Sequence, residues 1–176
     1  MLLVATPPLV DPNFDRTVVL LLEHSPLGAV GVVLNRPGEA AVEDALPGWE
    51  RLAADPGRVF VGGPVAGDAA IALGSARRPD PGSGWEAVVG PVGTIDLHRD
   101  PLDVLDDIAA VRIFAGYAGW GAGQLETELE AGAWIVAPAL PEDVLGPADD
   151  LWRRVLRRQG GRIAWLANAP EDPSVN

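Results

Sequence analysis

The 176-residue sequence contains no cysteine, and all 13 of its basic residues are arginine, so lysine is absent as well. Without cysteine the chain can form no disulfide bond, no thiolate metal site and no cysteine nucleophile. A Walker-type phosphate-binding loop requires lysine and is therefore excluded. The two histidines, His24 and His98, are too far apart in sequence for the HExxH pattern of a zinc enzyme. We accordingly expect neither a metal site nor a cofactor.

Two other enzyme signatures are incomplete. Ser75 and Ser83 both lie outside the G-x-S-x-G sequence of a nucleophile elbow. Gln124 stands where a dinucleotide-binding motif beginning at Gly119 would require its third glycine. The sequence therefore offers no residues that we can assign to catalysis, and it favours a protein without enzymatic activity.

Acidic side chains outnumber basic ones, and the formal net charge is −12. Such a charge repels nucleic acids and anionic membranes, whose phosphates must be neutralised by basic groups. The apolar runs, such as residues 18–22, are far too short to cross a bilayer. Residues 1–4 lack the basic start of a signal peptide. We expect a soluble cytoplasmic protein that binds neither a membrane nor, directly, a nucleic acid.

The composition predicts one domain over residues 1–176, because 48% of the residues are hydrophobic and no linker or repeat divides the chain. Apolar and β-branched runs predict strands at 2–5, 17–23, 29–34, 59–61, 69–73, 85–89, 92–97, 111–114 and 134–136. Apolar residues at helical spacing predict helices at 42–46, 101–109, 124–130 and 148–158. Strands outnumber helices without strict alternation, which favours an α+β fold with a mixed sheet.

Glycine is concentrated between positions 116 and 123, where four glycines surround Tyr117 and Trp120. Glycine permits positive φ and close backbone contact, so we expect a bend whose shape matters. A flat ligand could stack on Trp120, and the amide of Gly121 could help to bind an anion. Alternatively, Trp120 fills the space beside the glycines and fixes the bend. The structural interpretation is favoured, because acidic residues in the following helix would oppose an anion.

Six polar residues border the apolar strands: Asp15, Arg16, Glu23, His24, Asn35 and Arg36. If the hairpin register is tight, Asn35 leaves the sheet at the end where Arg16 enters it, and His24 lies at the opposite end. One interpretation is a small polar pocket in which Arg16 or Arg36 binds an anionic ligand. The other, more common at strand ends, is that these residues tie strands and turns together. A lone histidine such as His24 is also more often structural than catalytic.

The only cluster of basic residues lies near the C-terminus and comprises Arg153, Arg154, Arg157, Arg158 and Arg162. It could form a patch for a nucleic acid or an acidic partner. It could equally stabilise a helix, because Asp149 and Asp150 precede the first two arginines by four residues. We favour the structural interpretation and expect the last three arginines to remain free for a partner.

Three stretches identify a family resemblance: LLVATPPLVDPNFDRTVVLLLEHSPLGAVGVVLNRP, VFVGGPV and FAGYAGWGAGQLETELEAGAW. In this order and spacing they resemble the YqgE/AlgH family, and the match runs nearly from end to end. The resemblance implies an α+β fold whose mixed, mainly antiparallel sheet curls into a pseudo-barrel flanked by helices. Members have been described as transcriptional regulators. Many carry a histidine shortly after the GGPV strand, where this chain has Gly74.

These observations favour a non-enzymatic regulator or adaptor that acts through a macromolecular partner, in the first place a protein. The alternative is a small-ligand-binding protein or an unrecognised enzyme. Its polar pocket would lie between Arg16, Arg36 and a loop at 116–123, with Gly119, Trp120, Gly121 and Gln124 among the binding residues. Direct DNA binding, which the family description suggests, ranks third because of the negative charge. The sequence does not define an oligomeric state.

Overall fold

One long strand, β9 (Ile108–Gly121), organises the sheet in the computed structural model, which describes residues 1–77 and 85–170. Its first residues pair with β6 (Val65–Ala76), and its last residues pair with β3 (Gly28–Val33). The change of partner falls near Gly116, which has a φ of +70°. A Cβ added there would lie 2.7 Å from the carbonyl oxygen of Gly63, so this close crossing requires glycine. The predicted bend is therefore present, but most of the expected loop at 116–123 is strand.

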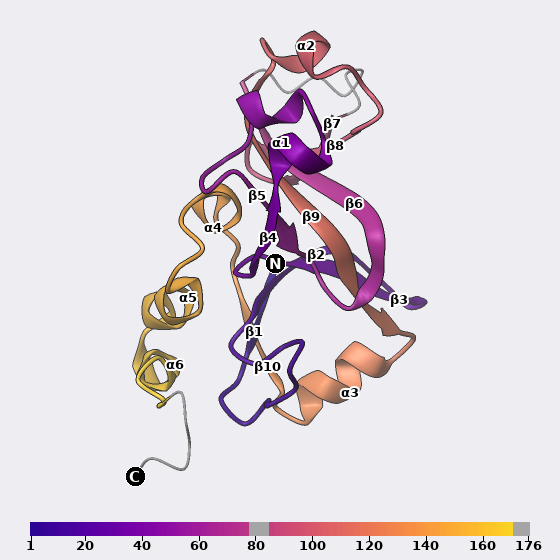
Figure 1. Cartoon of the computed structure of the whole chain (residues 1–176). Coiled ribbons are helices and arrows are strands. Elements are labelled where there is room, and N and C mark those ends of the chain that lie inside the picture. The colour runs from indigo at the N-terminus through magenta and orange to yellow at the C-terminus, as the bar shows by residue number, and fades with distance from the viewer. Residues whose placement is uncertain (78–84, 171–176) are drawn as a thin grey trace.

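The first half of the sheet is antiparallel, with the strand order β10-β1-β2-β3-β9 (Figure 1). Its remaining strands are β1 (Leu2–Ala5), β2 (Val18–Ser25) and β10 (Trp134–Ala137). Both faces of this half are buried: Leu20 belongs to the core on one face, and its neighbour Val19 belongs to the core on the other. Because both faces are covered there, the buried parts of these strands, such as residues 18–21, are apolar without alternating polar residues.

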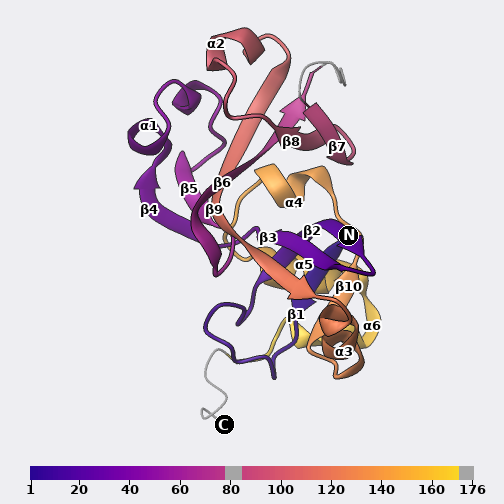
Figure 2. The same ribbon diagram turned by 90° about the vertical axis from the view of Figure 1, so that its right-hand side faces the viewer.

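The second half of the sheet lies on the other side of the bend (Figure 2). There β6 pairs with β8 (Val92–Ile95), which pairs in turn with β7 (Trp85–Val89). On the opposite side of β9, β5 (Arg58–Val61) runs parallel to it and pairs with β4 (Pro37–Ala41). The sheet is thus mixed and mostly antiparallel, as predicted.

Short helices pack at the end of the second half, at the top of Figure 1. They are α1 (Val42–Ala45), the 3-10 helix η1 (Trp49–Arg51) and α2 (Pro101–Val104). Trp49 is buried in one cluster with Trp85 and other apolar side chains of this half. These elements close that end of the curled sheet.

Four helices flank the first half of the sheet. α3 (Gln124–Glu130) packs on one face, where Leu125 is buried. α4 (Pro141–Leu145), α5 (Leu151–Gln159) and α6 (Gly161–Leu166) follow one another along the other face, at the left of Figure 1. The sheet curls into a half-barrel with helices around it, which confirms the predicted α+β fold.

Three features differ from the sequence-based expectation. The helix predicted at 101–109 ends at Val104, because Ile108 already pairs with Ala76 at the start of β9. β4 was not predicted, since none of its residues is buried and no apolar pattern marks it. Two short helices, α4 and α6, were missed as well. The polar, Pro- and Gly-rich sequence at 77–84 predicts a loop and residues 169–176 a tail, and both lie mostly outside the described residues. Among the described residues, no helix has the length and apolar character that crossing a membrane requires.

Candidate functional site

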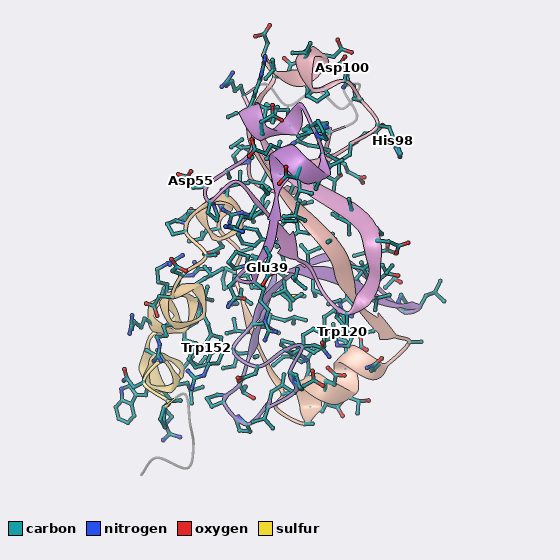
Figure 3. The ribbon with its side chains drawn as sticks, in the orientation of Figure 1. Glu39, Asp55, His98, Asp100, Trp120 and Trp152 are labelled. Carbon is teal, nitrogen blue, oxygen red and sulfur yellow. The ribbon has the colours of Figure 1, made fainter. Side chains whose placement is uncertain are left out.

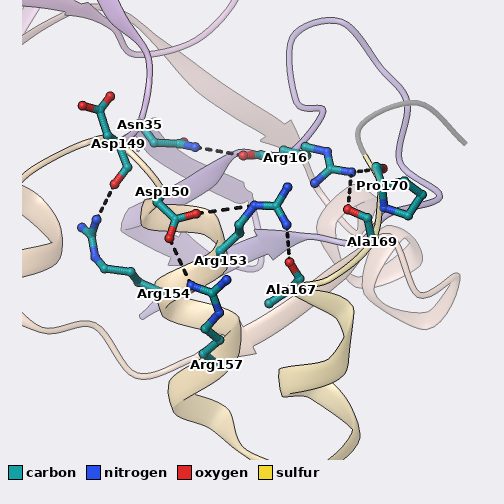
Figure 4. Close-up of polar contacts among 10 residues, drawn as sticks. All are labelled: Arg16, Asn35, Asp149, Asp150, Arg153, Arg154, Arg157, Ala167, Ala169 and Pro170. Carbon is teal, nitrogen blue, oxygen red and sulfur yellow. Dashed lines mark hydrogen bonds and ion pairs between the residues drawn. The ribbon is translucent and has the colours of Figure 1, made fainter. Parts of the chain in front are cut away.

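Arg16, a candidate for binding an anion, holds the end of the described chain. Its guanidinium carbon lies 4.7 Å from the centre of the Trp152 ring, and its Nη2 donates to the carbonyl oxygens of Ala169, at 3.1 Å, and Pro170 (Figure 4). The Asn35 side chain donates to the Arg16 carbonyl at 2.9 Å. These contacts tie β2, α5 and the C-terminal segment together, which supports the structural interpretation.

Arg36 lies at the same end of the sheet, as the sequence predicts. Its guanidinium donates to the carbonyl oxygens of Pro12, at 2.7 Å, and Asp15, at 3.0 Å. A hollow of about 80 Å³ lies beside it and reaches Gly63, which contacts the backbone of the glycine-rich strand. Ligand sites usually measure about 300 to 1,000 Å³. The predicted location therefore contains only a small hollow, and a ligand-binding role for Arg36 stays a prediction.

Glu23 and His24 lie at the opposite end of β2, also as expected. His24 Nε2 lies 2.7 Å from Glu126 Oε1 on α3. The hydrogen bond from His24 holds the pKa of Glu126 below its ordinary value. Glu23 is exposed and pairs with Val30 just beyond an irregularity in the β2–β3 ladder. This end of the hairpin is thus fastened to α3 and lies away from Arg16.

Trp120 is enclosed by its neighbours and is only 5% exposed (Figure 3). Its indole donates to Glu128 at 2.9 Å, and the same carboxylate oxygen accepts the indole of Trp134 at 2.8 Å. The two rings pack edge to face at 5.9 Å. Gln124 donates to the other Glu128 oxygen and accepts the Gly121 amide at 3.0 Å. Trp120, Gly121 and Gln124 therefore form one satisfied network that locks α3 onto the strand.

The helix-borne arginines are engaged more fully than expected (Figure 4). Arg153 and Arg157 both approach Asp150, at 3.5 and 3.1 Å, in place of the predicted four-residue pairing. Arg158 is not free, because it forms two hydrogen bonds of 2.6 Å with the buried carboxylate of Asp143. Within the described residues, only Arg162 of this cluster has no hydrogen bond or ion pair from its side chain.

A buried arginine that the sequence analysis overlooked connects segments that line an apolar pocket. Arg112 of β9 is 2% exposed and lies over the Phe60 ring, 4.3 Å from its centre. Its two terminal nitrogens donate to the carbonyl oxygens of Asp55, Val144, Leu145 and Gly146. One side chain thus ties the sheet to the segment before β5 and to the end of α4. An arginine inside the otherwise apolar run 108–115 was the signal in the sequence.

Burial lowers the pKa of Arg112 to about 10, and the nearby charge of Asp55 opposes that shift. Its Nε atom is buried without a hydrogen-bond partner. Around the segments that Arg112 joins lies a pocket of about 450 Å³, hereafter the Arg112 pocket. It is lined by Pro37, Ala54, Asp55, Pro56, Ala110, Leu145, Gly146, Pro147, Ala148 and Asp149. A perturbed pKa next to a cleft is a physical reason to consider this pocket a binding site.

The described residues contain no group of three or more side chains that could hold a metal ion. The polar groups nearest the pocket are also occupied by backbone contacts: Arg112 by carbonyl oxygens of the wall, and Arg154 by those of Pro147 and Asp149. The arrangement can therefore hold a group in an apolar cleft, and its two lining carboxylates are the polar groups that remain available.

Comparison with known proteins extends the likeness over the whole chain. A family model described as AlgH-like matches residues 2–164. A UPF0301 protein of Streptomyces avermitilis is 52% identical, and the match covers 99% of this chain and 93% of that protein. A UPF0301 protein of Mycobacterium ulcerans is 49% identical, over 99% and 89% of the two chains.

Two solved structures share the fold. A crystal structure of a protein from Corynebacterium diphtheriae has a TM-score of 0.90 and 32% identity, and the match covers 96% of this chain and 90% of that one. The solution structure of the AlgH protein from Pseudomonas aeruginosa has a TM-score of 0.70 and 30% identity, over 97% and 93% of the chains.

Proposed function

The chain belongs to the AlgH-like family, and we propose that it is a non-enzymatic cytoplasmic regulator or adaptor that binds a protein partner at the Arg112 pocket. The family membership and the sequence features behind this proposal describe the chain as a whole and do not indicate where a partner would bind. The proposal adds a location to that expectation, and one observation carries it: a buried cation ties together two of the segments that line an apolar pocket.

Burying a guanidinium group is energetically costly even when carbonyl oxygens surround it, and an apolar residue of similar volume often costs less. Arg112 is buried in this way, and the desolvation is large enough to lower its pKa to about 10. Through its hydrogen bonds, the Arg112 side chain fixes the positions of two chain segments, one at Asp55 and one at 144–146. Residues of both segments line the pocket. A residue that costs stability while it fixes the shape of a pocket supports a binding role for that pocket.

The surroundings of the pocket favour a protein over a small metabolite. Pro37, Pro56 and Pro147 line the pocket and are exposed at the surface, so an extended partner could contact them without closing any lid. Proline is already restricted in φ, which reduces the entropy that a binding surface loses. On the same side of the molecule, α6 carries Trp165, which is 76% exposed. Tryptophan is enriched at protein interfaces.

The test compares two alanines that neighbour each other on β9. Ala110 lines the pocket, whereas Ala109 is exposed and points to the opposite face of the strand. Tagged wild-type, Ala110→Phe and Ala109→Phe chains would be purified gently from the native host and measured by native mass spectrometry. We expect a stoichiometric protein partner on the wild type and on A109F, and its loss from A110F. Equal recovery on A110F, with an unchanged melting temperature, would remove the pocket from the proposal.

A second candidate is a small-ligand-binding protein that uses the same pocket, since about 450 Å³ lies within the usual range of ligand sites. The same spectra distinguish the two functions. A stoichiometric mass of a few hundred daltons, absent from A110F, would favour a small ligand. Direct DNA binding remains the third reading, and a mobility shift that survives physiological salt would favour it over both.

A further inference from the structure

We infer that the partner inserts a basic side chain, arginine or lysine, into the Arg112 pocket. The inference rests on the proposed function, because it assigns a chemistry to the same site. It depends on three properties of the pocket: two exposed carboxylates that form no ion pair, guanidinium groups that face backbone oxygens, and an apolar lining.

The pocket is lined by two carboxylates, of which Asp55 is near enough to Arg112 to interact with it electrostatically. Asp55 precedes β5 (Figure 3), and Asp149 precedes α5, so they come from the two segments that Arg112 ties together. Both residues are exposed, and neither side chain forms an ion pair or hydrogen bond with a described residue. No arginine or histidine is among the lining residues.

Two guanidinium groups lie close to the pocket without occupying it. The hydrogen bonds of Arg112 run to wall carbonyls, and Arg154 donates to the carbonyl oxygens of Pro147 and Asp149. Formally these two cations balance Asp55 and Asp149. The charged side chains that line the cavity are nevertheless the carboxylates, whereas the two cations are bound by backbone oxygens and are not among the lining residues. A third cation that enters the cavity would therefore meet acceptors first.

The rest of the lining suits the aliphatic stem of such a side chain. Three prolines, three alanines and Leu145 provide apolar surface, and arginine and lysine bury their methylene groups on such surface while the charged head stays near water. An acidic group would meet two like charges, and a purely apolar one would leave both carboxylates without a partner. The excess of negative charge over the whole chain, −12, would also attract a basic segment.

The inference can be tested with defined probes on the full-length protein. N-acetyl-arginine amide would be titrated in parallel with N-acetyl-citrulline amide, which has nearly the same shape without the charge, and with N-acetyl-glutamate amide. Backbone amide shifts of Leu145, Gly146 and Ala148 would report binding by NMR. We expect shifts with the arginine probe, and at least about threefold weaker binding of citrulline, because each exposed charge pair contributes modestly.

Two variants identify the groups responsible. The double variant Asp55→Asn and Asp149→Asn removes both charges and should weaken binding of the arginine probe about three- to tenfold. Asp68→Asn with Asp103→Asn changes the net charge equally at exposed positions outside the pocket lining and should leave binding unchanged. Ala110→Phe should abolish the shifts by filling the cavity, whereas Ala109→Phe should not.

Each contrary result has its own meaning. Equal binding of citrulline and arginine, or stronger binding of the glutamate probe, would overturn the inference and leave the docking pocket in place. Capture of a partner that depends on Ala110, combined with no binding of the arginine probe, would also overturn it and would leave the proposed function standing. Arginine binding that follows the two aspartates, without any captured partner, would support the charge preference and count against the adaptor.

Discussion

The guanidinium group of Arg16 lies over the indole of Trp152, with 4.7 Å between the guanidinium carbon and the ring centre. The indole NH of Trp152 donates to the carbonyl oxygen of Ala5 at 2.8 Å. Arg153 approaches the same ring at 5.9 Å and donates to Ala167. One tryptophan therefore connects β1, the start of β2 and the C-terminal segment, and residues that looked like a ligand site in sequence serve this connection.

Replacing Arg16 by alanine should destabilise the protein by about 1–3 kcal/mol, because the cation–π contact and the hydrogen bonds to Ala169 and Pro170 are lost together. Urea denaturation monitored by circular dichroism would measure the change. Arg162→Ala is the matched control, since this exposed side chain has no hydrogen bond or ion pair within the described residues. A change of less than about 0.5 kcal/mol for R16A, the range of ordinary surface substitutions, would contradict the structural role.

Arg112→Met should lower the free energy of unfolding by about 2–4 kcal/mol. The four carbonyl oxygens at Asp55 and 144–146 would lose their donor, although the costly buried charge would also be removed. The wild type should gain stability relative to R112M as pH rises above about 10. The unfolded state binds more protons there, because burial lowers the pKa of Arg112 in the folded state. A stability difference independent of alkaline pH would argue against a desolvated cation.

Glu128→Ala should cost about 2–4 kcal/mol, because the partly buried indole NH groups of Trp120 and Trp134 would both lose their acceptor. Glu130→Ala on the exposed side of the same helix serves as the control and should change stability by less than about 0.5 kcal/mol. Thermal unfolding followed by tryptophan fluorescence would report both effects. Similar melting temperatures for the two variants would contradict the proposed indole–carboxylate network.

Gly116→Ala should destabilise the protein by more than about 2 kcal/mol, because a left-handed φ of +70° combines with a Cβ placed 2.7 Å from a backbone oxygen. Gly119→Ala three residues further along the strand is the natural comparison. Its added Cβ would meet Tyr117 at 3.4 Å, which is ordinary contact. We expect G119A to remain close to wild type in chemical denaturation. Equal losses for both alanines would show that the bend does not require glycine at one particular position.

His24→Ala should raise the pKa of Glu126 toward its ordinary value of 4.5, since the hydrogen bond from His24 is the main cause of the lowered pKa. Because folding lowers this pKa, the interaction stabilises the protein above about pH 4.5 and is lost as pH falls through the lower folded value. NMR titration of the Glu126 carboxyl carbon would measure the pKa, with His98→Ala as control. An unchanged Glu126 pKa in H24A would refute the contact.

The fold was largely accessible from sequence because long apolar strands and turn residues act locally. The runs in β1, β2, β3 and β10 are strongly β-branched or leucine-rich, and each was placed to within a few residues. The failures have tertiary causes. Residues 105–109 carry a helical pattern, yet the pairing of Ile108 with Ala76 makes that position the start of a strand.

The candidate pocket was far less accessible. Its wall comes from segments near positions 37, 55, 110 and 147, which no local pattern connects. Arg112 stood out in sequence only as a charge within an apolar strand. That signal identifies an unusual residue but does not indicate which carbonyl oxygens accept its hydrogen bonds.

By itself, the sequence determined that a mixed sheet forms, that glycine bends the chain near position 116, and that thiol and lysine chemistry are absent. These properties follow from composition and from backbone preferences that act over a few residues. Only the tertiary structure decided that Arg16, Asn35 and Arg36 tie elements together and that Arg112 shapes a pocket. A guanidinium group binds whichever oxygens the fold brings within about 3 Å, and those oxygens are set by contacts between distant segments.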